Sequence, residues 1–225
     1  MSQDPLSEIN LKSAQKPVKE RQFKGLSLAE RKQARREKLI EAGIQAYGTH
    51  GFFSVTVKDI CNEAKLTERY FYESFQKSEQ LFQNIFLKQI EILQSTMMQA
   101  IVQASPNPRK MVTAGLSALF NLLKNDPRLA RIIYIDATLV QELHKQAIIR
   151  ETMNKFDRMI QAFVMSLMPQ IPQAEQEISL VATGLNGYVT QVARRWVIGE
   201  FKQSQDEIVA ACELVFIALI EKFIP

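Results

Sequence analysis

The stretch Thr56-Val-Lys-Asp-Ile-Cys-Asn-Glu-Ala-Lys-Leu-Thr-Glu-Arg-Tyr-Phe-Tyr-Glu-Ser-Phe75 decides the fold of this chain. Its first half carries one apolar face with the i, i+3, i+4 and i+7 spacing of a short helix, formed by Val57, Ile60, Cys61 and Ala64. Its second half places Phe71 and Phe75 four residues apart, on the inward face of another short helix. Thr56 and Thr67 stand where helix caps are expected. The pattern therefore predicts two short helices joined by a tight turn at Lys65 and Leu66.

Helical patterns also cover most of the remaining chain. Ser27 and Glu30 have the spacing of a capping box, and they open a helix that is expected to end near Gly48. Beyond the motif, helices are expected at Ser78–Ala104 and at about 109–124, 127–143, 145–168, 173–201 and 204–223. No run alternates apolar and polar residues between hairpin signals. The predicted fold class is all-α, with an N-terminal three-helix helix-turn-helix domain followed by a C-terminal helical bundle.

Positive charge is concentrated just before the motif. Between Lys19 and Lys38 eight Lys or Arg face three Glu, a net charge of +5, whereas the rest of the chain has 20 basic and 21 acidic side chains. A basic segment that leads into a folded domain commonly meets a polyanion, because each phosphate contact releases condensed counterions. A solvated tail with a charged helix face would give the same composition. Residues 1–27 are expected to form a flexible basic tail.

The residues around the motif follow a family pattern. The matching stretches are Glu37–Gly51, Thr56–Ile60, Leu66–Phe75 and Glu79–Leu81, and in this spacing they resemble the tetracycline-repressor (TetR) family of transcription regulators. The resemblance implies a DNA-binding domain at 28–95 and a ligand-binding and dimerisation domain at 96–225. It also implies a homodimer, in which each copy inserts the helix at 67–74 into a major groove of a palindromic double-stranded operator.

The resemblance assigns roles to individual residues. Phosphate contacts are expected from Thr56, Lys58, Thr67, Tyr72 and Lys77. The reading helix adds Glu68, Arg69, Tyr70, Glu73 and Ser74 to the DNA-binding set. Arg69 is expected to read guanine, while Glu68 or Glu73 accepts from a cytosine amino group or holds Arg69 in place. Capping alone would also explain both threonines, Tyr70 and Tyr72 would also suit a half-buried core position, and the two glutamates would also suit a solvated face.

The chain departs from the family pattern at three places. Lys65 stands where the family usually has Gly, and a left-handed backbone there would cost a lysine about 1 kcal/mol. Lys77 precedes Ser78, whereas the family usually places Ser or Asp before Lys, which leaves the phosphate contact of Lys77 open. Cys61 replaces a usual Ala and is interpreted as a small buried thiol, with a redox sensor as the alternative.

The C-terminal part is expected to hold a dimer interface and a ligand pocket. Two copies of the last two helices are predicted to form a four-helix interface through Val181, Leu185, Val189, Trp196, Cys212, Val215, Phe216 and Leu219. The alternative is that these residues belong to the core of one chain. The pocket candidates are Met111, Phe120, Tyr134, Met159, Phe163 and Met165, all of which would also suit an ordinary core.

The predicted function is a repressor that a small hydrophobic or amphipathic effector releases from its operator, with Ser78–Ala104 as the lever between the pocket and the DNA-binding domain. An activator, or a DNA-binding regulator without a ligand, is the alternative. No enzyme motif, metal-binding motif or cofactor motif occurs, and the two histidines, His50 and His144, lie far apart in the sequence. No apolar run is long enough for a membrane span, and a scaffold that binds membranes through its basic tail would have only Phe23 as an anchor. A cytoplasmic location is expected.

Overall fold

The chain folds into helices arranged as a small head and a larger body. The structure is a computed structural model, and it describes residues 27–140, 143, 145, 147–167 and 175–223. Within these residues no β-strand occurs. The elements in chain order are α1 (Leu28–His50), η1 (Phe52–Ser54), α2 (Val57–Ala64), α3 (Glu68–Ser74), α4 (Ser78–Ala104), α5 (Pro108–Asn125), α6 (Pro127–Arg131), η2 (Ile132–Asp136), α7 (Ala137–Leu139), α9 (Ala147–Leu167), α10 (Glu175–Ile198) and α11 (Gln205–Phe223). The expected all-α class is confirmed, and the expected tail lies outside the described residues except for Ser27.

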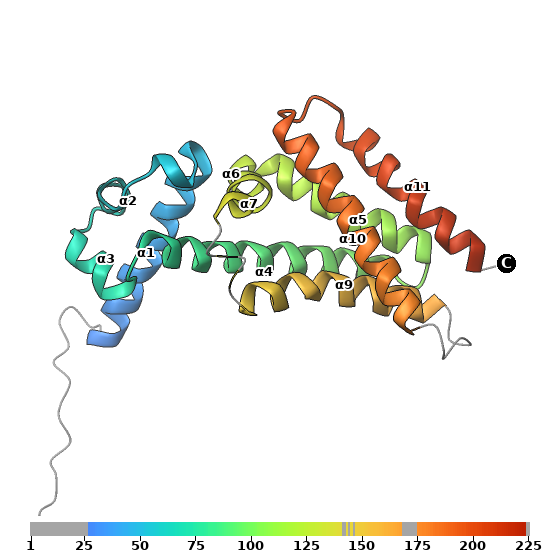
Figure 1. Ribbon diagram of the computed structural model, residues 1–225, viewed down its shortest axis with the longest axis horizontal. Helices are drawn as coiled ribbons and strands as arrows, with labels where there is room; N and C mark the ends of the chain where they lie inside the picture. Colours follow the sequence, from blue (N-terminus) through green and yellow to red (C-terminus); the bar gives the residue numbers. More distant parts are fainter. Residues whose placement is uncertain (1–26, 141–142, 144, 146, 168–174, 224–225) are drawn as a thin grey trace, which may run out of the picture.

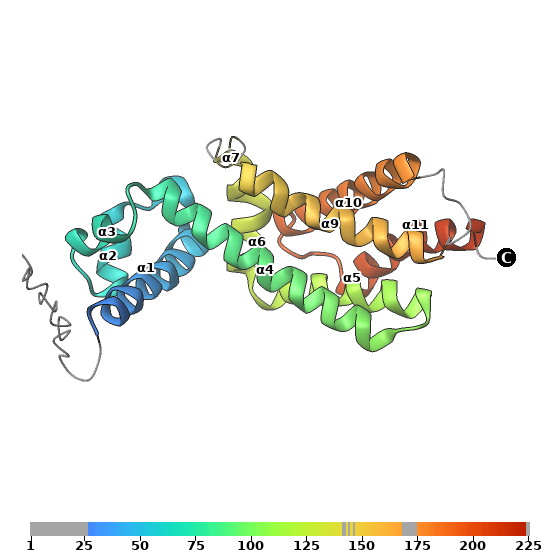
Figure 2. The ribbon, with the colours of Figure 1, turned by 90° about the horizontal axis from the view of Figure 1, so that it is seen from below.

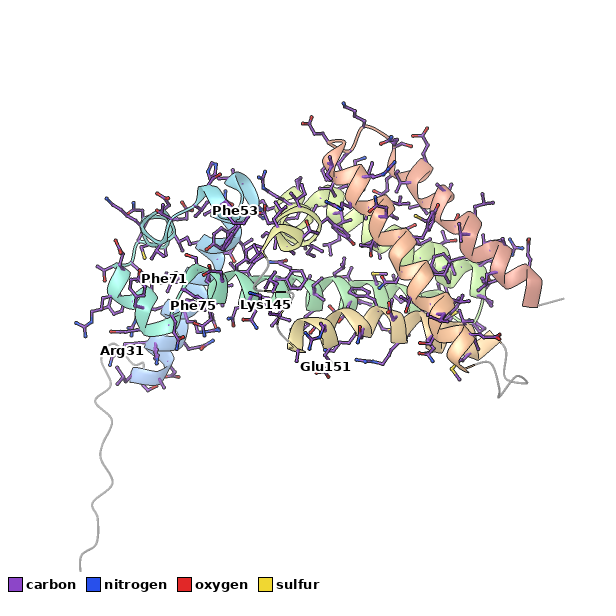
Figure 3. The ribbon with its side chains drawn as sticks, viewed as in Figure 1. Arg31, Phe53, Phe71, Phe75, Lys145 and Glu151 are labelled. Carbon is purple, nitrogen blue, oxygen red and sulfur yellow. The ribbon has the colours of Figure 1, made fainter. Side chains whose placement is uncertain are left out.

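The head contains α1, α2 and α3, packed on the first turns of α4 (Figure 1). Phe71 and Phe75 of the motif are fully buried there, together with Tyr47 and Phe82. Figure 3 shows Phe71 and Phe75 pointing into the head. These aromatic side chains give α1, α2 and α3 a shared core, without which helices as short as α2 and α3 would not be stable.

Two of the predicted helix starts form as capping boxes. The Ser27 hydroxyl accepts from the Glu30 amide at the start of α1, and the Thr56 hydroxyl accepts from the Asp59 amide at the start of α2. Thr67 occupies the cap position of α3, but its side chain makes no capping hydrogen bond. The prediction of side-chain capping is therefore wrong for Thr67.

The turn between α2 and α3 is strained at one residue. Lys65 has φ 53° and ψ 43°, in the left-handed region that favours glycine. Its amide and that of Leu66 both donate to the carbonyl of Cys61, which closes the end of α2. The turn geometry therefore requires this conformation whichever residue is present.

We expect Lys65→Gly to raise the free energy of unfolding by up to about 1 kcal/mol, because glycine adopts the left-handed region without a Cβ penalty. Chemical denaturation of the two proteins measures the difference. Lys65→Ala is the control, since it removes the same charge but keeps the Cβ, and it should not be stabilising. An equal gain in both variants would assign the effect to the lysine charge instead.

The body is a helical bundle reached by the long helix α4. This helix starts in the head and continues into the body, where it packs on α5 and α9 (Figures 1 and 2). In the body α5 also contacts α11, and α10 contacts both α9 and α11. The predicted lever thus spans both parts of the molecule.

The segment expected to be one helix at about 127–143 is divided. It begins as α6, continues through η2, which is a π-helix, and ends as the single turn α7. A π-helical turn inside a helical run often marks a functional site. Here it carries a buried acidic residue, Asp136, between apolar neighbours.

Candidate DNA-binding head and ligand cavity

The helix α3, which is expected to read DNA, presents a charged cluster. The Arg69 guanidinium donates from Nε to Glu73 Oε1 at 3.1 Å, and Arg35 of α1 lies 3.8 Å from the other oxygen of Glu73. The Arg69 side chain nevertheless remains 83% exposed. Glu73 therefore restrains Arg69 while leaving most of its guanidinium accessible to solvent, and the positive charge of Arg35 partly offsets the negative charge of Glu73.

The two tyrosines of α3 differ in their environment. Tyr70 is half-buried, with the Arg35 guanidinium 4.4 Å from the centre of its ring. Tyr72 is 57% exposed and touches the edge of Phe71. The sequence left a core role open for both residues. The contacts favour a structural role for Tyr70 and a surface role for Tyr72.

Most of the residues expected to contact phosphates lie at the surface. Thr56, Lys58, Thr67 and Lys77 are exposed, and Ser74 and Glu68 belong to α3 itself. The Thr56 hydroxyl is engaged, because it donates to Asp59 Oδ2 at 2.6 Å, and hydrogen bonds from Thr56 hold the pKa of Asp59 below its usual value. Capping therefore accounts for Thr56 on its own, whereas no capping hydrogen bond uses the hydroxyl of Thr67.

The head contacts the body at a tight junction. The helix α1 packs on α6 so closely that a Cβ on Gly48 would lie 2.3 Å from Cβ and 2.8 Å from Cα of Arg128. Arg128 donates to Asp126 Oδ1 at 2.9 Å and to Gln45 of α1 at 2.7 Å. Only glycine at position 48 permits this approach.

A buried carboxylate forms a second contact at the junction. Asp136 of η2 is 3% exposed, and its Oδ2 accepts from the backbone amide of Phe52 in the head at 3.3 Å. Arg131 Nε lies 3.6 Å from the same oxygen, which is an ion pair too long for a hydrogen bond. Burial raises the pKa of Asp136, and the nearby Arg131 charge and the Phe52 amide offset this only in part. Sequence reasoning missed this residue, because a single Asp in an apolar helical run has no pattern.

The body contains a cavity of about 420 Å³ between α4, α5, η2, α9 and α10. Most of its wall is apolar, as expected for a small-molecule site. Four of the six predicted pocket residues line it, namely Met111, Tyr134, Met159 and Phe163. The expectation is corrected for two residues. Phe120 is fully buried against Trp196, and Met165 is 43% exposed.

Polar groups in the cavity wall come mainly from α10. Asn186, Thr190 and Arg194 follow one another at four-residue steps and therefore share a face of this helix. None of them was among the pocket residues expected from sequence. The sequence contains a signal for them, because polar residues at positions i, i+4 and i+8 interrupt an otherwise apolar helix face. The same spacing is also typical of a polar helix face that is exposed to solvent.

Apolar residues remain uncovered on α10 and α11. Leu180 is 74% exposed and Leu214 is 71% exposed, and no atom lies within 4 Å of a Cβ built on Gly184 or Gly187. The interface expected from sequence needs correction here, because five of its residues lie inside one chain: Leu185, Val189, Trp196, Cys212 and Phe216. Val181 and Val215 are exposed, and Leu219 is half-buried. The sequence-based prediction assigned the most apolar face of each helix to the interface. The faces of α10 and α11 that point outward carry fewer large apolar residues, and these lie next to small residues.

Both cysteines are buried thiols. Burial raises the pKa of Cys61, and it raises the pKa of Cys212 to about 12. Raised values disfavour the thiolate that redox chemistry requires. Among the described residues, no cluster of His, Cys, Asp and Glu is suited to hold a metal ion. The helices described are all too short or too polar to cross a membrane.

Comparisons with known proteins identify the head. Residues 39–85 match the model of "Bacterial regulatory proteins, tetR family". Over 167 residues the chain is 22% identical to the "Probable acrEF/envCD operon repressor" of Escherichia coli (strain K12), covering 72% of this chain and 76% of that protein.

Solved structures share the whole fold. The fatty acid degradation regulator FadR from Bacillus halodurans superposes with a TM-score of 0.68 at 16% identity, over 80% of this chain and 93% of that one. FadR from Bacillus subtilis, solved in complex with stearoyl-CoA, gives a TM-score of 0.60 at 16% identity, over 82% and 97%. A TetR-family regulator from Pectobacterium atrosepticum gives 0.66 at 18% identity, over 88% and 97%. Residues 39–85 thus form a DNA-binding domain of the kind found in bacterial regulatory proteins of the tetR family, and the chain is a DNA-binding transcription regulator.

Proposed function

We propose that this regulator is a homodimeric repressor, and that it leaves its operator when a small hydrophobic or amphipathic molecule fills the cavity of the body. The observation that carries the proposal is the position of η2. Ile133 and Tyr134 of this segment line the cavity, while Asp136 of the same segment holds the Phe52 amide of the head. A molecule in the cavity therefore contacts a segment that is hydrogen-bonded to the head.

The helix α4 supplies a parallel connection. Its first turns carry Leu81 and Phe82 in the core of the head, and its later turns carry Met97 and Ile101 in the cavity wall. An effector can release DNA only if it binds the DNA-free arrangement more tightly than the DNA-bound one. A small displacement of α4 and η2 that separates the two heads provides this difference, because operator half-sites lie about 34 Å apart.

The uncovered faces of α10 and α11 support the dimer. Leu180, Gly184 and Gly187 share one face of α10, and Ala211, Leu214 and Ala218 share one face of α11. Small residues beside an exposed leucine on each helix permit close approach of a second helix pair. Two copies related by a two-fold axis would bury both faces in a four-helix interface and present two reading helices to one operator.

Recognition of DNA is assigned to α3. Arg69 reads guanine in the major groove from the position in which Glu73 holds it, and Tyr72, Thr67, Lys58 and Lys77 bind the phosphates on either side. Arg35 contributes charge from α1, close to Glu73. This division predicts that base preference and overall affinity respond to different residues.

We expect the purified protein to bind a palindrome upstream of its own gene, with an affinity that falls steeply as salt rises. Arg69→Ala should weaken binding to that palindrome by roughly 5- to 150-fold and reduce the preference at one base pair, since a bidentate base contact contributes about 1–3 kcal/mol. Tyr72→Phe should weaken binding to all sequences by a smaller, similar factor. Fluorescence anisotropy across a salt series measures both effects.

Arg158→Ala is the matched control, because Arg158 is an exposed arginine on α9 in the body. It removes the same charge and should leave the operator affinity unchanged. Equal losses for Arg69→Ala on operator and on scrambled DNA would contradict the assignment of base reading to Arg69. Operator binding that no cavity ligand alters would contradict a repressor released by an effector.

A further inference from the structure

One charged side chain lies in the wall of the cavity. Among the described lining residues, Arg194 is the only one that carries a charge, and the wall around it is otherwise mainly aliphatic, aromatic and methionine side chains. A cation beside apolar surface is costly unless an anion or a set of acceptors faces it. The question is therefore which group accepts from this guanidinium.

The described part of the chain provides no acceptor for Arg194 Nε. This nitrogen is buried, and it has no hydrogen-bond partner. Buried side-chain donors are nearly always satisfied, so an orphaned guanidinium nitrogen in a cavity wall points to an acceptor supplied by a bound molecule.

The nearest polar residues on the same face of α10 are engaged or neutral. Asn186 donates to Asp157 Oδ1 at 2.6 Å, and Thr183 donates to the other oxygen of Asp157 at 2.9 Å. Asp157 is thus held at Asn186, which lies about 12 Å along the helix from Arg194 at a rise of about 1.5 Å per residue. Thr190 between them is neutral and supplies a hydroxyl to the same side of the cavity.

The remainder of the wall suits a flexible hydrocarbon. Met97 and Ile101 of α4, Met111 of α5 and Met159 of α9 line the cavity. Methionine side chains adapt to flexible apolar ligands, because they are unbranched and polarisable. The cavity of about 420 Å³ is of ligand size.

From these observations we propose that the cavity binds a single-chain amphiphile with a carboxylate head, and that Arg194 pairs with that carboxylate while the chain lies among the methionines. The inference rests on the proposed function, since it names the class of effector. A guanidinium presents two parallel N–H groups that match the two oxygens of a carboxylate, and Thr190 adds a hydroxyl one turn away. The helix α10, which carries Arg194, also packs on η2, the segment that contains Asp136.

The test is isothermal titration of the full-length protein, without DNA, with three probes of equal chain length: sodium decanoate, 1-decanol and decyltrimethylammonium. We expect decanoate to bind more tightly than 1-decanol by roughly 10- to 100-fold, since a hydrogen bond to a charged group contributes about that factor. The cationic probe should bind most weakly. Fluorescence of Trp196, the single tryptophan, gives an independent signal, because it is buried in the core of the body on the same helix as Arg194.

Three variants assign the effect. Arg194→Gln should remove the advantage of decanoate over 1-decanol while leaving the affinity for 1-decanol unchanged, which also shows that the cavity is intact. Arg194→Lys should retain part of the advantage, because charge remains but the paired N–H groups are lost. Arg195→Gln, at the exposed neighbouring position, should behave as wild type.

Equal affinity of the wild type for decanoate and 1-decanol, absence of decanoate binding, or an equal loss in Arg195→Gln would overturn the inference. Operator release is measured separately. If decanoate binds through Arg194 and leaves the operator complex intact, the inference stands and the effector-released repressor fails. If 1-decanol alone binds and releases the operator, the repressor stands and the carboxylate inference fails.

Discussion

Replacing Leu180 and Leu214 together by glutamate is expected to convert the regulator into monomers and to weaken operator binding by roughly 100-fold or more. Both side chains are more than 70% exposed in the single chain, and each lies on a face with small residues beside it. A two-fold axis would bring four added carboxylates into one apolar interface. Each buried charge without a partner costs about 3–5 kcal/mol, so the dimer would dissociate rather than bury them.

The loss of DNA affinity follows from the loss of the second head. Two linked heads bind a palindrome more tightly than one head by a factor of roughly 10² to 10⁴, because the second contact is intramolecular. Sedimentation analysis measures the oligomeric state, and anisotropy with full and half operators measures the affinity. The variant should bind both DNA molecules equally weakly, whereas the wild type should prefer the full operator.

Leu139→Glu is the matched control. Leu139 is a leucine of α7 that is 53% exposed and lies outside α10 and α11, so a glutamate there should leave the dimer and the operator affinity unchanged. A double variant that stays dimeric and binds the operator as the wild type does would place the interface on another surface. Dissociation of both proteins would point to general destabilisation instead.

The helix-turn-helix could be predicted from sequence because its signals are local. Caps, apolar spacing and a short break lie within twenty consecutive residues, from Thr56 to Phe75. The left-handed conformation at Lys65 was also predictable, since the turn geometry requires it whichever residue stands there. The lengths of α5, α9, α10 and α11 agreed with prediction to within a few residues, because proline and capping residues delimit them.

The cavity and the interface were less predictable because they depend on which side of an apolar helix meets its own chain. Phe216 and Val189 line the cavity, whereas Val215 and Val181 face solvent. All four are apolar residues in apolar helices, so the sequence alone does not distinguish the two pairs. The spacing of residues shows which of them share a face of α10 or α11. It does not show which of those faces the rest of the chain covers. The same reason explains why Arg194 and Asp136 were missed, since their significance lies in what surrounds them.

Asp136→Ala is expected to separate the cavity from the head. The substitution removes the acceptor of the Phe52 amide and leaves Arg131 without its partner. A backbone N–H that loses its buried acceptor costs about 1–3 kcal/mol, so η1 should open more often. Hydrogen exchange of the segment 51–54 should therefore accelerate, and mass spectrometry of the amide-deuterated protein measures it.

The functional consequence concerns release rather than binding. Coupling between an effector site and a second site typically changes affinity by roughly 5- to 150-fold. If η2 transmits that coupling, the ratio of operator affinities without and with saturating decanoate should be close to one in Asp136→Ala. The operator affinity of this variant without decanoate should stay close to that of the wild type. Decanoate binding in the absence of DNA should persist, because Asp136 does not line the cavity.

Asp136→Asn distinguishes the hydrogen bond from the charge. Its side-chain oxygen can still accept from the Phe52 amide, whereas the ion pair with Arg131 is lost. If the hydrogen bond transmits the effect, Asp136→Asn should keep the amides of 51–54 protected from hydrogen exchange. Decanoate should also still release the operator from this variant. If Asp136→Ala exchanges faster at 51–54 and still releases the operator as the wild type does, η2 is not the connection, and the displacement of α4 alone must move the heads apart.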